Sequence, residues 1–151
     1  METTIQKSVE LGANRIIPII CQRSNIKSSK EKLDKKLNHW KKVAISACEQ
    51  SGRTVIPEIA EVIFIKDLGG LLNQDTLKVT LNPKAQISIR DAEENNHIDI
   101  MIGPEGGLND EEIQLLEDNG FINVSFGPRI LRTETAGPAV ISALQTLWGD
   151  I

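Results

Sequence analysis

The sequence has few of the residues that build metal centres, disulfide frameworks or membrane spans. It contains two cysteines and two histidines in 151 residues, and His39 and His97 lack the neighbours that a metal cluster needs. No apolar run approaches the roughly 18 residues that a membrane-spanning helix requires, and no secretory signal opens the chain. These absences predict a cytoplasmic protein without a metal, in which Cys48 is a small buried residue of a helix.

Positive charge is also in deficit, because 21 acidic residues outnumber 17 basic ones and the formal net charge is −4. Taken alone, this balance argues against binding to nucleic acid. The stretch from Arg23 to Lys42, however, carries a net charge of +6, and the rest of the chain carries −10. Such a stretch is usually a solvated helix face, and a phosphate-contacting surface is the alternative.

The sequence shows no repeat, low-complexity stretch or linker, so we expect one domain over residues 1–151. Apolar periodicity predicts a first helix that is capped by Thr3 or Thr4 and ends at Gly12. It also predicts a long helix over residues 29–50, stopped by Gly52. The apolar stripe of this long helix consists of Leu33, Leu37, Trp40, Ala44 and Ala47.

Short apolar segments bounded by turn residues predict strands over residues 15–20, 62–65, 77–81, 98–102 and 124–126, with a further short segment at 55–59. Pro18 favours an edge or irregular position in the first of them. Residues 67–72 fit a brief helix or turn, and Asn109 with Glu112 forms a capping pair for a helix that ends before Gly120. The alternation of strands and helices indicates an α/β fold with a mostly parallel sheet.

The last helix is expected to start near residue 135, which keeps Pro138 within its first turn. One face of this helix carries its large apolar side chains. They are Val140, Leu144, Leu147 and Trp148.

Two segments place glycine and proline where a predicted strand has just ended. The first is residues 102–107 (IGPEGG), whose glycines let the backbone approach a ligand closely. Ligands of open α/β sheets bind beyond the carboxyl ends of the strands, where this loop must lie. It matches neither the dinucleotide fingerprint nor the P-loop, and a tight turn leading into a capped helix is the alternative.

The second segment is residues 125–136 (SFGPRILRTETA), in which two arginines, a glutamate and two threonines follow a short strand. Arg129 and Arg132 are rigid donors suited to a phosphate or a base edge. An arginine–glutamate surface pair with a threonine cap is the alternative. The density of polar residues beside the end of an apolar strand favours a site.

At these motifs the sequence resembles a known family. IGPEGGLNDEEI followed by SFGPRILRTETAGPA is similar to the RsmE family, ribosomal RNA uridine-N3 methyltransferases of the SPOUT superfamily. KSVELGANRIIPI resembles the first helix and strand of that family, and HWKKVAISACEQSGRTVIPEI resembles its long helix. ILRTETA, with a GPEGG loop upstream, is a specific signature, and the resemblance extends over the whole chain.

The resemblance implies a SPOUT fold, with a mostly parallel sheet flanked by helices and a deep trefoil knot near the C-terminus, an exception to the rule against threaded loops. It implies S-adenosylmethionine as cofactor, 16S ribosomal RNA or the small ribosomal subunit as substrate, and a homodimer with the last helix at or near its interface. The implied cofactor pocket contains the strand end at Leu81 and two loops. They comprise Ile102, Gly103, Pro104, Glu105, Gly106 and Gly107, and then Ser125, Phe126, Gly127, Arg129, Ile130, Leu131, Arg132, Thr133, Thr135 and Ala136.

The sequence also departs from the family. Members carry an N-terminal RNA-binding domain of the PUA-like type and a first strand before the helix that opens this chain, so we expect a truncated catalytic domain whose sheet is one strand short. The family segment Thr-Glu-Arg-Ser is replaced by Cys21-Gln22-Arg23-Ser24, so only Arg23 and Ser24 carry over. Phe126 stands where the family commonly has leucine.

For methylation of uridine N3, a group must remove the N3 proton or stabilise the charge that spreads to O2 and O4. Arg132 or Arg129 is a candidate for charge stabilisation, and Glu105 or Glu134 is a candidate base, although a glutamate needs a raised pKa to act efficiently. Arg23 and Lys27 are expected to contact RNA. Two alternatives stay open: a truncated dimeric domain that binds the cofactor without useful methylation, and a sibling SPOUT enzyme with another RNA target.

Overall fold

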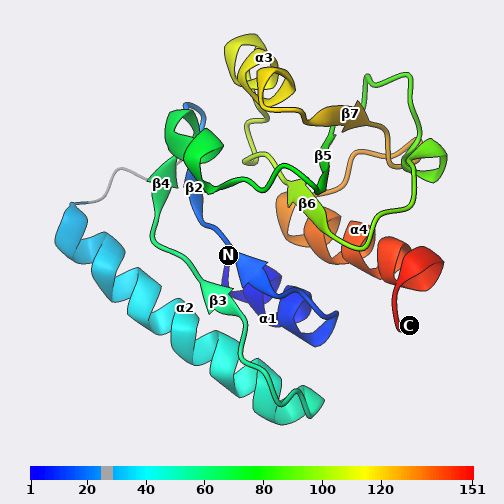
Figure 1. Cartoon of the computed structure of the whole chain (residues 1–151). Helices are drawn as coiled ribbons and strands as arrows, with labels where there is room; N and C mark the ends of the chain where they lie inside the picture. The colour runs from blue at the N-terminus through cyan, green and yellow to red at the C-terminus, as the bar shows by residue number, and fades with distance from the viewer. Residues whose placement is uncertain (25–28) are drawn as a thin grey trace.

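The computed structural model describes residues 1–24 and 29–151, and it confirms the α/β class. Short strands alternate with helices along the chain, and every paired strand is parallel to its neighbour (Figure 1). The elements are α1 (Glu2–Glu10), β1 (Arg15–Ile16), β2 (Ile19–Ile20), α2 (Lys30–Ser51), β3 (Glu58–Ile59), β4 (Ile63–Phe64), η1 (Ile65–Leu71), β5 (Leu77–Leu81), η2 (Ile89–Asp91), β6 (Ile98–Met101), α3 (Asp110–Asp118), β7 (Ile122–Val124) and α4 (Thr133–Trp148).

The helices α2 and α3 begin and end close to where the sequence predicts. Ser29 is the N-cap of α2, and Gly52 ends it with a left-handed φ of 74°. The first helix differs from the prediction, because α1 begins at Glu2 with Met1 as N-cap, so neither threonine caps it. Its first turn is closed by the N–H of Ile5, which donates to the carbonyl of Met1 (2.9 Å), and Ile5 and Val9 are buried against α2.

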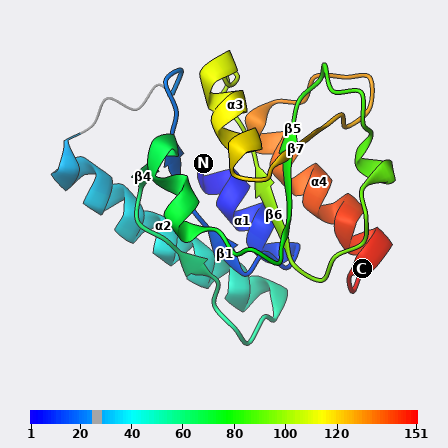
Figure 2. The same cartoon turned by 45° about the horizontal axis from the view of Figure 1, so that its top comes forward.

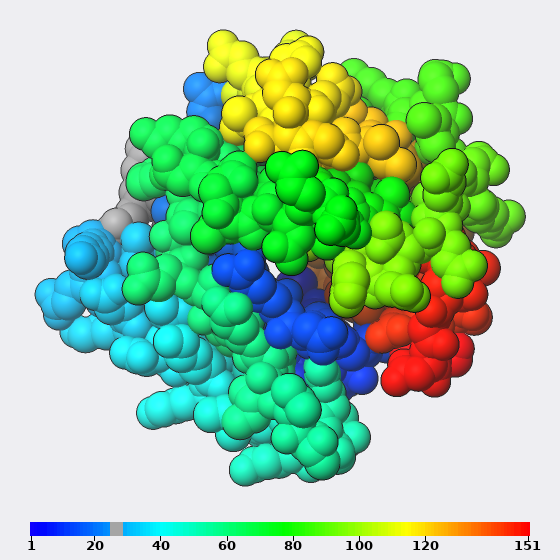
Figure 3. Space-filling view, in the orientation of Figure 1, coloured from blue at the N-terminus to red at the C-terminus, as the bar shows by residue number. Residues whose placement is uncertain are grey.

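The strand predicted over residues 15–20 is interrupted. Pro18 has no N–H to donate, and the pairing divides into β1 with β3 and β2 with β4 on either side of it. Among the described residues these two ladders are not hydrogen-bonded to the three-stranded sheet, whose strand order is β6-β5-β7. Figure 3 shows the surface hollowed between the blue segment that follows α1 and the green segments that precede β5 and β6.

Two boundaries near the C-terminus differ from the prediction. The strand β7 covers Ile122–Val124 instead of residues 124–126, because its register on β5 pairs Val79 with Ile122 and Leu81 with Val124. The helix α4 starts at Thr133, two residues before the expected position, so Pro138 is its sixth residue and lies beyond the first turn. Pro138 has no N–H, so α4 lacks the bond that a residue at this position would donate to the carbonyl of Glu134, while the ladder already begins with the N–H of Ala136 and the carbonyl of Arg132.

The elements form layers in which α1 lies between α2 and α4, as Figures 1 and 2 show. The α4 helix covers one face of the three-stranded sheet, where Val140 and Leu144 pack with Val79 and Val124. Leu147, predicted on the same face of the helix, is 55% exposed. On the other side, Met101 of β6 belongs to a cluster with residues of α3 and η1. The trefoil knot stays a prediction.

Candidate functional site

The carboxyl ends of β5, β6 and β7 lie at one edge of the sheet because the three strands run parallel. The register pairs Thr80 with Met101 and Leu81 with Val124, so the chain leaves the three strands close together. This edge is where open parallel sheets bind ligands. Both glycine-containing segments identified in the sequence begin there, the first after β6 and the second after β7.

Residues 102–107 fold into a tight turn that leads into α3. The N–H of Gly107 donates to the carbonyl of Pro104 (2.8 Å), and Gly107 has a φ of 70°, a conformation that favours glycine. At Gly106 an added Cβ would lie 3.0 Å from the Cβ of Arg23, so a side chain there has little room. The tight turn weighed in the sequence is therefore present, and its exposed residues are Glu105, Gly106 and Gly107.

The second segment contacts the first through the start of α4. Ser125 follows β7 and is held by its N–H, which donates to the carbonyl of Ile87 (2.8 Å). Further along, the hydroxyl of Thr133 donates to the carbonyl of Gly103 (3.3 Å). This hydrogen bond joins the two loops that the sequence assigns to one pocket, although 30 positions separate the two residues.

The four charged residues proposed for catalysis, Glu105, Arg129, Arg132 and Glu134, are all exposed. Within residues 1–24 and 29–151 their side chains make no hydrogen bond or ion pair with one another, so the surface pair of the alternative interpretation is not formed there. Their charges remain available to a substrate. Ile130, between the two arginines, is 83% exposed.

Of the two residues predicted to contact RNA, Arg23 lies directly against the first loop. Its Nη1 donates to the carbonyl of Gly106 (3.1 Å), and the side chain is largely exposed. Lys27 lies outside the described residues. The structure thus brings one predicted RNA-contacting residue next to the predicted cofactor loop.

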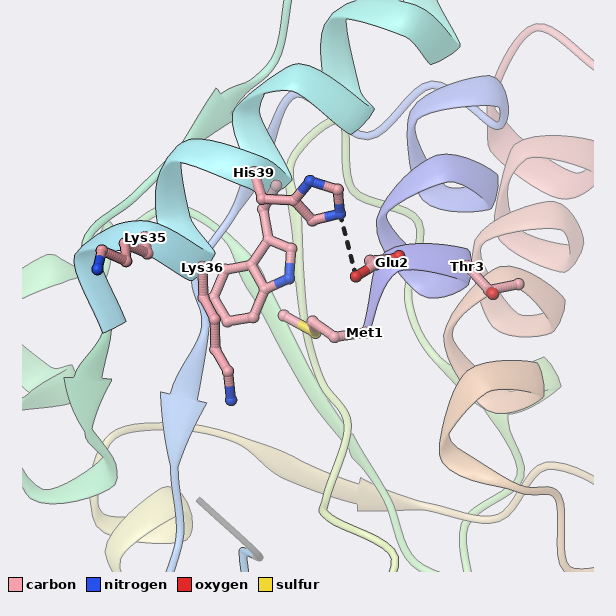
Figure 4. Close-up of a pocket in the computed structure, with 7 residues that line it drawn as sticks. Met1, Glu2, Thr3, Lys35, Lys36 and His39 are labelled. Carbon is pink, nitrogen blue, oxygen red and sulfur yellow. Dashed lines mark ion pairs between the residues drawn. The ribbon is translucent and has the colours of Figure 1, made fainter. Parts of the chain in front are cut away.

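Two lysines of α2, Lys35 and Lys36, lie elsewhere, along a hollow between the starts of α1 and α2 (Figure 4). His39 reaches from α2 toward Glu2, with 3.1 Å between Nε2 and Oε1. None of the residues predicted to bind the cofactor lines this hollow. Its lining consists of Met1, Glu2, Thr3, Lys35, Lys36, His39 and Trp40.

A buried carboxylate that the sequence identified only as a helix cap also lies at the site. Glu112 is 6% exposed, and its Oε2 accepts from the N–H of Asn109 (3.0 Å), as a capping box requires. Its Oε1 accepts from the N–H of Gln22 (2.7 Å), and the side-chain amide of Asn109 donates to the side chain of Gln22. The spacing of Asn109 and Glu112 signalled the cap, whereas no local pattern signals a contact with Gln22.

The buried thiol of Cys21 lies beside this carboxylate. Burial, and then the negative charge of Glu112, raise the pKa of Cys21 from 9.0 to about 11, while a hydrogen bond with Ser24 acts in the opposite direction. The group is therefore a neutral thiol near pH 7 and a poor nucleophile. Cys21 and Cys48 are both buried and free.

Other classes of site find little support in the described part of the chain. It holds no group of three or more histidine, cysteine, aspartate or glutamate side chains arranged to bind a metal ion. No described helix is both long and apolar enough to cross a membrane.

Comparison with known proteins agrees with the motifs. A family model for the RNA methyltransferase domain matches residues 1–145. The ribosomal RNA small subunit methyltransferase E of Buchnera aphidicola (subspecies Schizaphis graminum) is 40% identical over 100% of this chain and 62% of its own length. The chain thus spans about three fifths of the length of the relatives it matches.

Two solved structures have the same fold. One is a Legionella pneumophila protein, described as a methyltransferase in complex with its cofactor SAM, with a TM-score of 0.94 and 41% identity over 100% of this chain and 62% of that one. The other is the ribosomal RNA small subunit methyltransferase E of Neisseria gonorrhoeae, bound to S-adenosyl methionine, with a TM-score of 0.93 and 39% identity over the same shares. The chain belongs to the RNA methyltransferase domain family, and the resemblance to the RsmE proteins is confirmed.

Proposed function

We propose that this chain is the catalytic part of an S-adenosylmethionine-dependent methyltransferase that modifies N3 of a uridine in 16S ribosomal RNA. The relatives are named for methylation of small-subunit ribosomal RNA, and two structural neighbours bind S-adenosylmethionine. The observation that carries the proposal is the hydrogen bond from Thr133 to Gly103, because it unites both signature loops at the ligand-binding edge of the sheet.

The residues at this edge suit the cofactor. Gly103 and Gly107 have no side chain that would keep a ligand from the backbone of this loop, and the partly buried side chains of Leu81, Ile102 and Leu131 are apolar surfaces suited to an adenine ring. S-adenosylmethionine, when bound, supplies a methyl group that its sulfonium has already activated. The rest of the proposed pocket is Pro104, Glu105, Gly106, Ser125, Phe126, Gly127, Arg129, Ile130, Arg132, Thr133, Thr135 and Ala136.

The chain's own residues must orient the uracil and manage its N3 proton. Arg129 or Arg132 donates hydrogen bonds to O2 or O4 and stabilises the negative charge there as N3–H is lost. Glu105 or Glu134 accepts the proton. All four side chains are exposed: Glu105 in the loop after β6, Arg129 in the loop after β7, and Arg132 and Glu134 at the start of α4, which suits contact with a large substrate.

Partners and domain arrangement belong to the proposal as well. We propose that residues 1–151 form a SPOUT catalytic domain that works as a homodimer, and that RNA affinity depends on a further RNA-binding domain of the PUA-like type. A domain that binds the cofactor without useful methylation, and a sibling enzyme with another RNA target, are the rival functions.

The test is methylation of small-subunit RNA and of assembled small subunits with labelled S-adenosylmethionine. It uses this chain and a fusion that adds the N-terminal segment of a longer relative. Nucleoside mass spectrometry should identify N3-methyluridine as the product. Methylation at another position favours the sibling enzyme, and cofactor binding without methylation by either protein favours the binding domain.

A further inference from the structure

Glu112 makes more contacts than a helix cap requires. In a capping box the glutamate needs only its bond to the N-cap N–H, and here Oε2 makes that bond with Asn109. The other oxygen, Oε1, accepts from the N–H of Gln22, which belongs to the segment after β2. Among the described residues Glu112 is the only buried acidic side chain, so both bonds are shielded from water.

The segment that Glu112 holds is a closed turn. The N–H of Cys21 donates to the hydroxyl of Ser24 (2.9 Å), and the N–H of Ser24 donates back to the carbonyl of Cys21 (3.0 Å). Gln22 and Arg23 occupy the two positions between them. Fixing the N–H of Gln22 therefore also fixes the backbone from which the next side chain, Arg23, extends.

Arg23 connects this turn to the loop after β6. Its guanidinium donates to the carbonyl of Gly106, and its Cβ lies 3.0 Å from the position where a Cβ at Gly106 would be. The same loop is held on its other side by the hydrogen bond from Thr133 to Gly103. If the turn were displaced, the loop would lose its contact with Arg23 but would keep its hydrogen bond with Thr133.

We propose that Glu112 is a positioning residue, which fixes the Cys21–Ser24 turn and thereby holds Arg23 against the loop that binds the cofactor. The inference rests on the proposed function, because it assigns that loop to S-adenosylmethionine. A carboxylate suits the task, since it accepts two N–H groups at once and charge-assisted hydrogen bonds are stronger than neutral ones. Glutamine in its place has a single acceptor oxygen and loses one of the two bonds.

The test is a double-mutant cycle with Glu112→Gln and Arg23→Ala, measured by calorimetric binding of S-adenosylhomocysteine to the whole chain. Each single variant should weaken binding by about two- to tenfold, as loss of one hydrogen bond allows. The affinity of the double variant should equal that of the single variant with the lower affinity, because both changes release the same contact. Glu111→Gln is the matched control: it removes an exposed carboxylate from the same helical turn and should leave binding unchanged.

A second measurement does not depend on the cofactor. Amide hydrogen exchange at Gln22 should become faster in Glu112→Gln and stay unchanged in Glu111→Gln. Unchanged exchange at Gln22, or additive losses of affinity in the cycle, would overturn the proposal and leave Glu112 as a structural cap.

If the native chain binds no cofactor, the proposed function fails, and the exchange at Gln22 still reports whether Glu112 holds the turn. Arg23→Ala changes an exposed side chain, so it tests the contact with the loop even if Glu112→Gln does not fold.

Discussion

Gly106 and Gly107 shape the loop after β6 for different physical reasons. Gly107 has a positive φ, which most side chains disfavour, while space is open around the position where its Cβ would be. At Gly106 space is the restriction, because Arg23 presents its Cβ, carbonyl and Cδ to that position. Adjacent glycines thus serve one turn, the first for a close approach and the second for backbone conformation.

Substitution of Gly106 by arginine should abolish cofactor binding. The new side chain must displace Arg23 or enter the loop that we assign to the cofactor, and either change disrupts that loop. Calorimetry with S-adenosylmethionine should show no binding to Gly106→Arg while its circular dichroism stays that of a folded protein. Gly70→Ala is the control, because the space around Gly70 is open and binding should be retained. A Gly106→Arg variant with native affinity would exclude this loop from the pocket.

The buried thiol of Cys21 should make stability depend on alkaline pH. Because folding raises the pKa of Cys21 to about 11, its stabilising contribution is present below its ordinary value of 9.0 and is lost as the pH rises through 11. The free energy of unfolding, measured in urea, should therefore fall between pH 9 and 11. The fall should be shallower in Cys21→Ala, whose unfolding is compared over the same range. Equal slopes for both proteins would mean that the thiol does not titrate differently on folding.

Helices were easier to predict from this sequence than strands, and the reason is the range of the interactions that define them. Asn109 and Glu112 mark the start of α3 through contacts three residues apart, so local spacing contained the signal. The strand β7 is defined by its pairing with β5, some 43 positions earlier at Val79 and Ile122, and its predicted position was two residues too late. Two- and three-residue strands carry too little periodicity to correct such an error.

The same distinction explains the candidate site. Glycine and proline after two predicted strands, together with the family motifs, led us to predict that both loops form one site, and the hydrogen bond from Thr133 to Gly103 joins them. The contacts from Arg23 to Gly106 and from Gln22 to Glu112 join segments more than 80 residues apart, and they depend on how the sheet brings strand ends together. No local pattern encodes that arrangement.

Gly52 offers a test of how α2 ends. Its φ of 74° is left-handed, and nothing lies within 4 Å of the position where a Cβ would be, so alanine there introduces backbone strain without a steric clash. We expect Gly52→Ala to lower the free energy of unfolding by about 1 kcal/mol, or the melting temperature by roughly 2–4 °C. The matched control is Gly70→Ala, which meets equally open space without a left-handed φ and should change stability by less than about 0.5 kcal/mol. Equal effects of both variants would contradict the assigned role.

Large apolar side chains are exposed at the C-terminal end of the chain. Leu147 is 55% exposed and Ile151 is 60% exposed, while neighbouring Trp148 is only partly buried against the core of α4. A single chain leaves this surface in water. An isologous contact between two copies of α4 would cover it, because such an interface uses the same patch on both subunits.

We therefore expect a homodimer in solution. Light scattering at micromolar concentration should give about twice the 16.7 kDa mass of one chain. Leu147→Glu should shift the mass to that of one chain, because it buries a charge in the interface. Val55→Glu changes a side chain that is 68% exposed on another part of the fold and should leave the dimer intact. A native mass equal to one chain would count decisively against the pairing.

Charge is distributed unevenly over the molecule, and this distribution bears on how a chain of net charge −4 meets RNA. The stretch from Arg23 to Lys42 is +6, but the structure divides it. Arg23 lies at the candidate pocket, whereas Lys35 and Lys36 line the hollow beside the start of α1. Lys35 is also paired with Glu31 at 2.8 Å, which reduces its charge toward a partner. Only part of the basic stretch is therefore expected to contact phosphate.

The last prediction separates that part from the remainder. Each phosphate contact releases counterions, so binding of a small-subunit RNA fragment should weaken steeply with salt. The double variant Arg23→Glu with Lys27→Glu should reduce the steepness of log K against log salt by about two units, one per contact. The matched control is Lys35→Glu with Lys36→Glu, which makes the same change of charge on α2 and should leave the slope nearly unchanged.

Cofactor affinity is measured in parallel, because Arg23 also supports the loop at Gly106 and its loss can weaken the binding of both RNA and cofactor. Lys27→Glu alone, which has no assigned role in that loop, then reports on RNA. If the slopes of both double variants equal that of the native chain, the basic stretch is an ordinary solvated face, and RNA must be recognised by other surfaces.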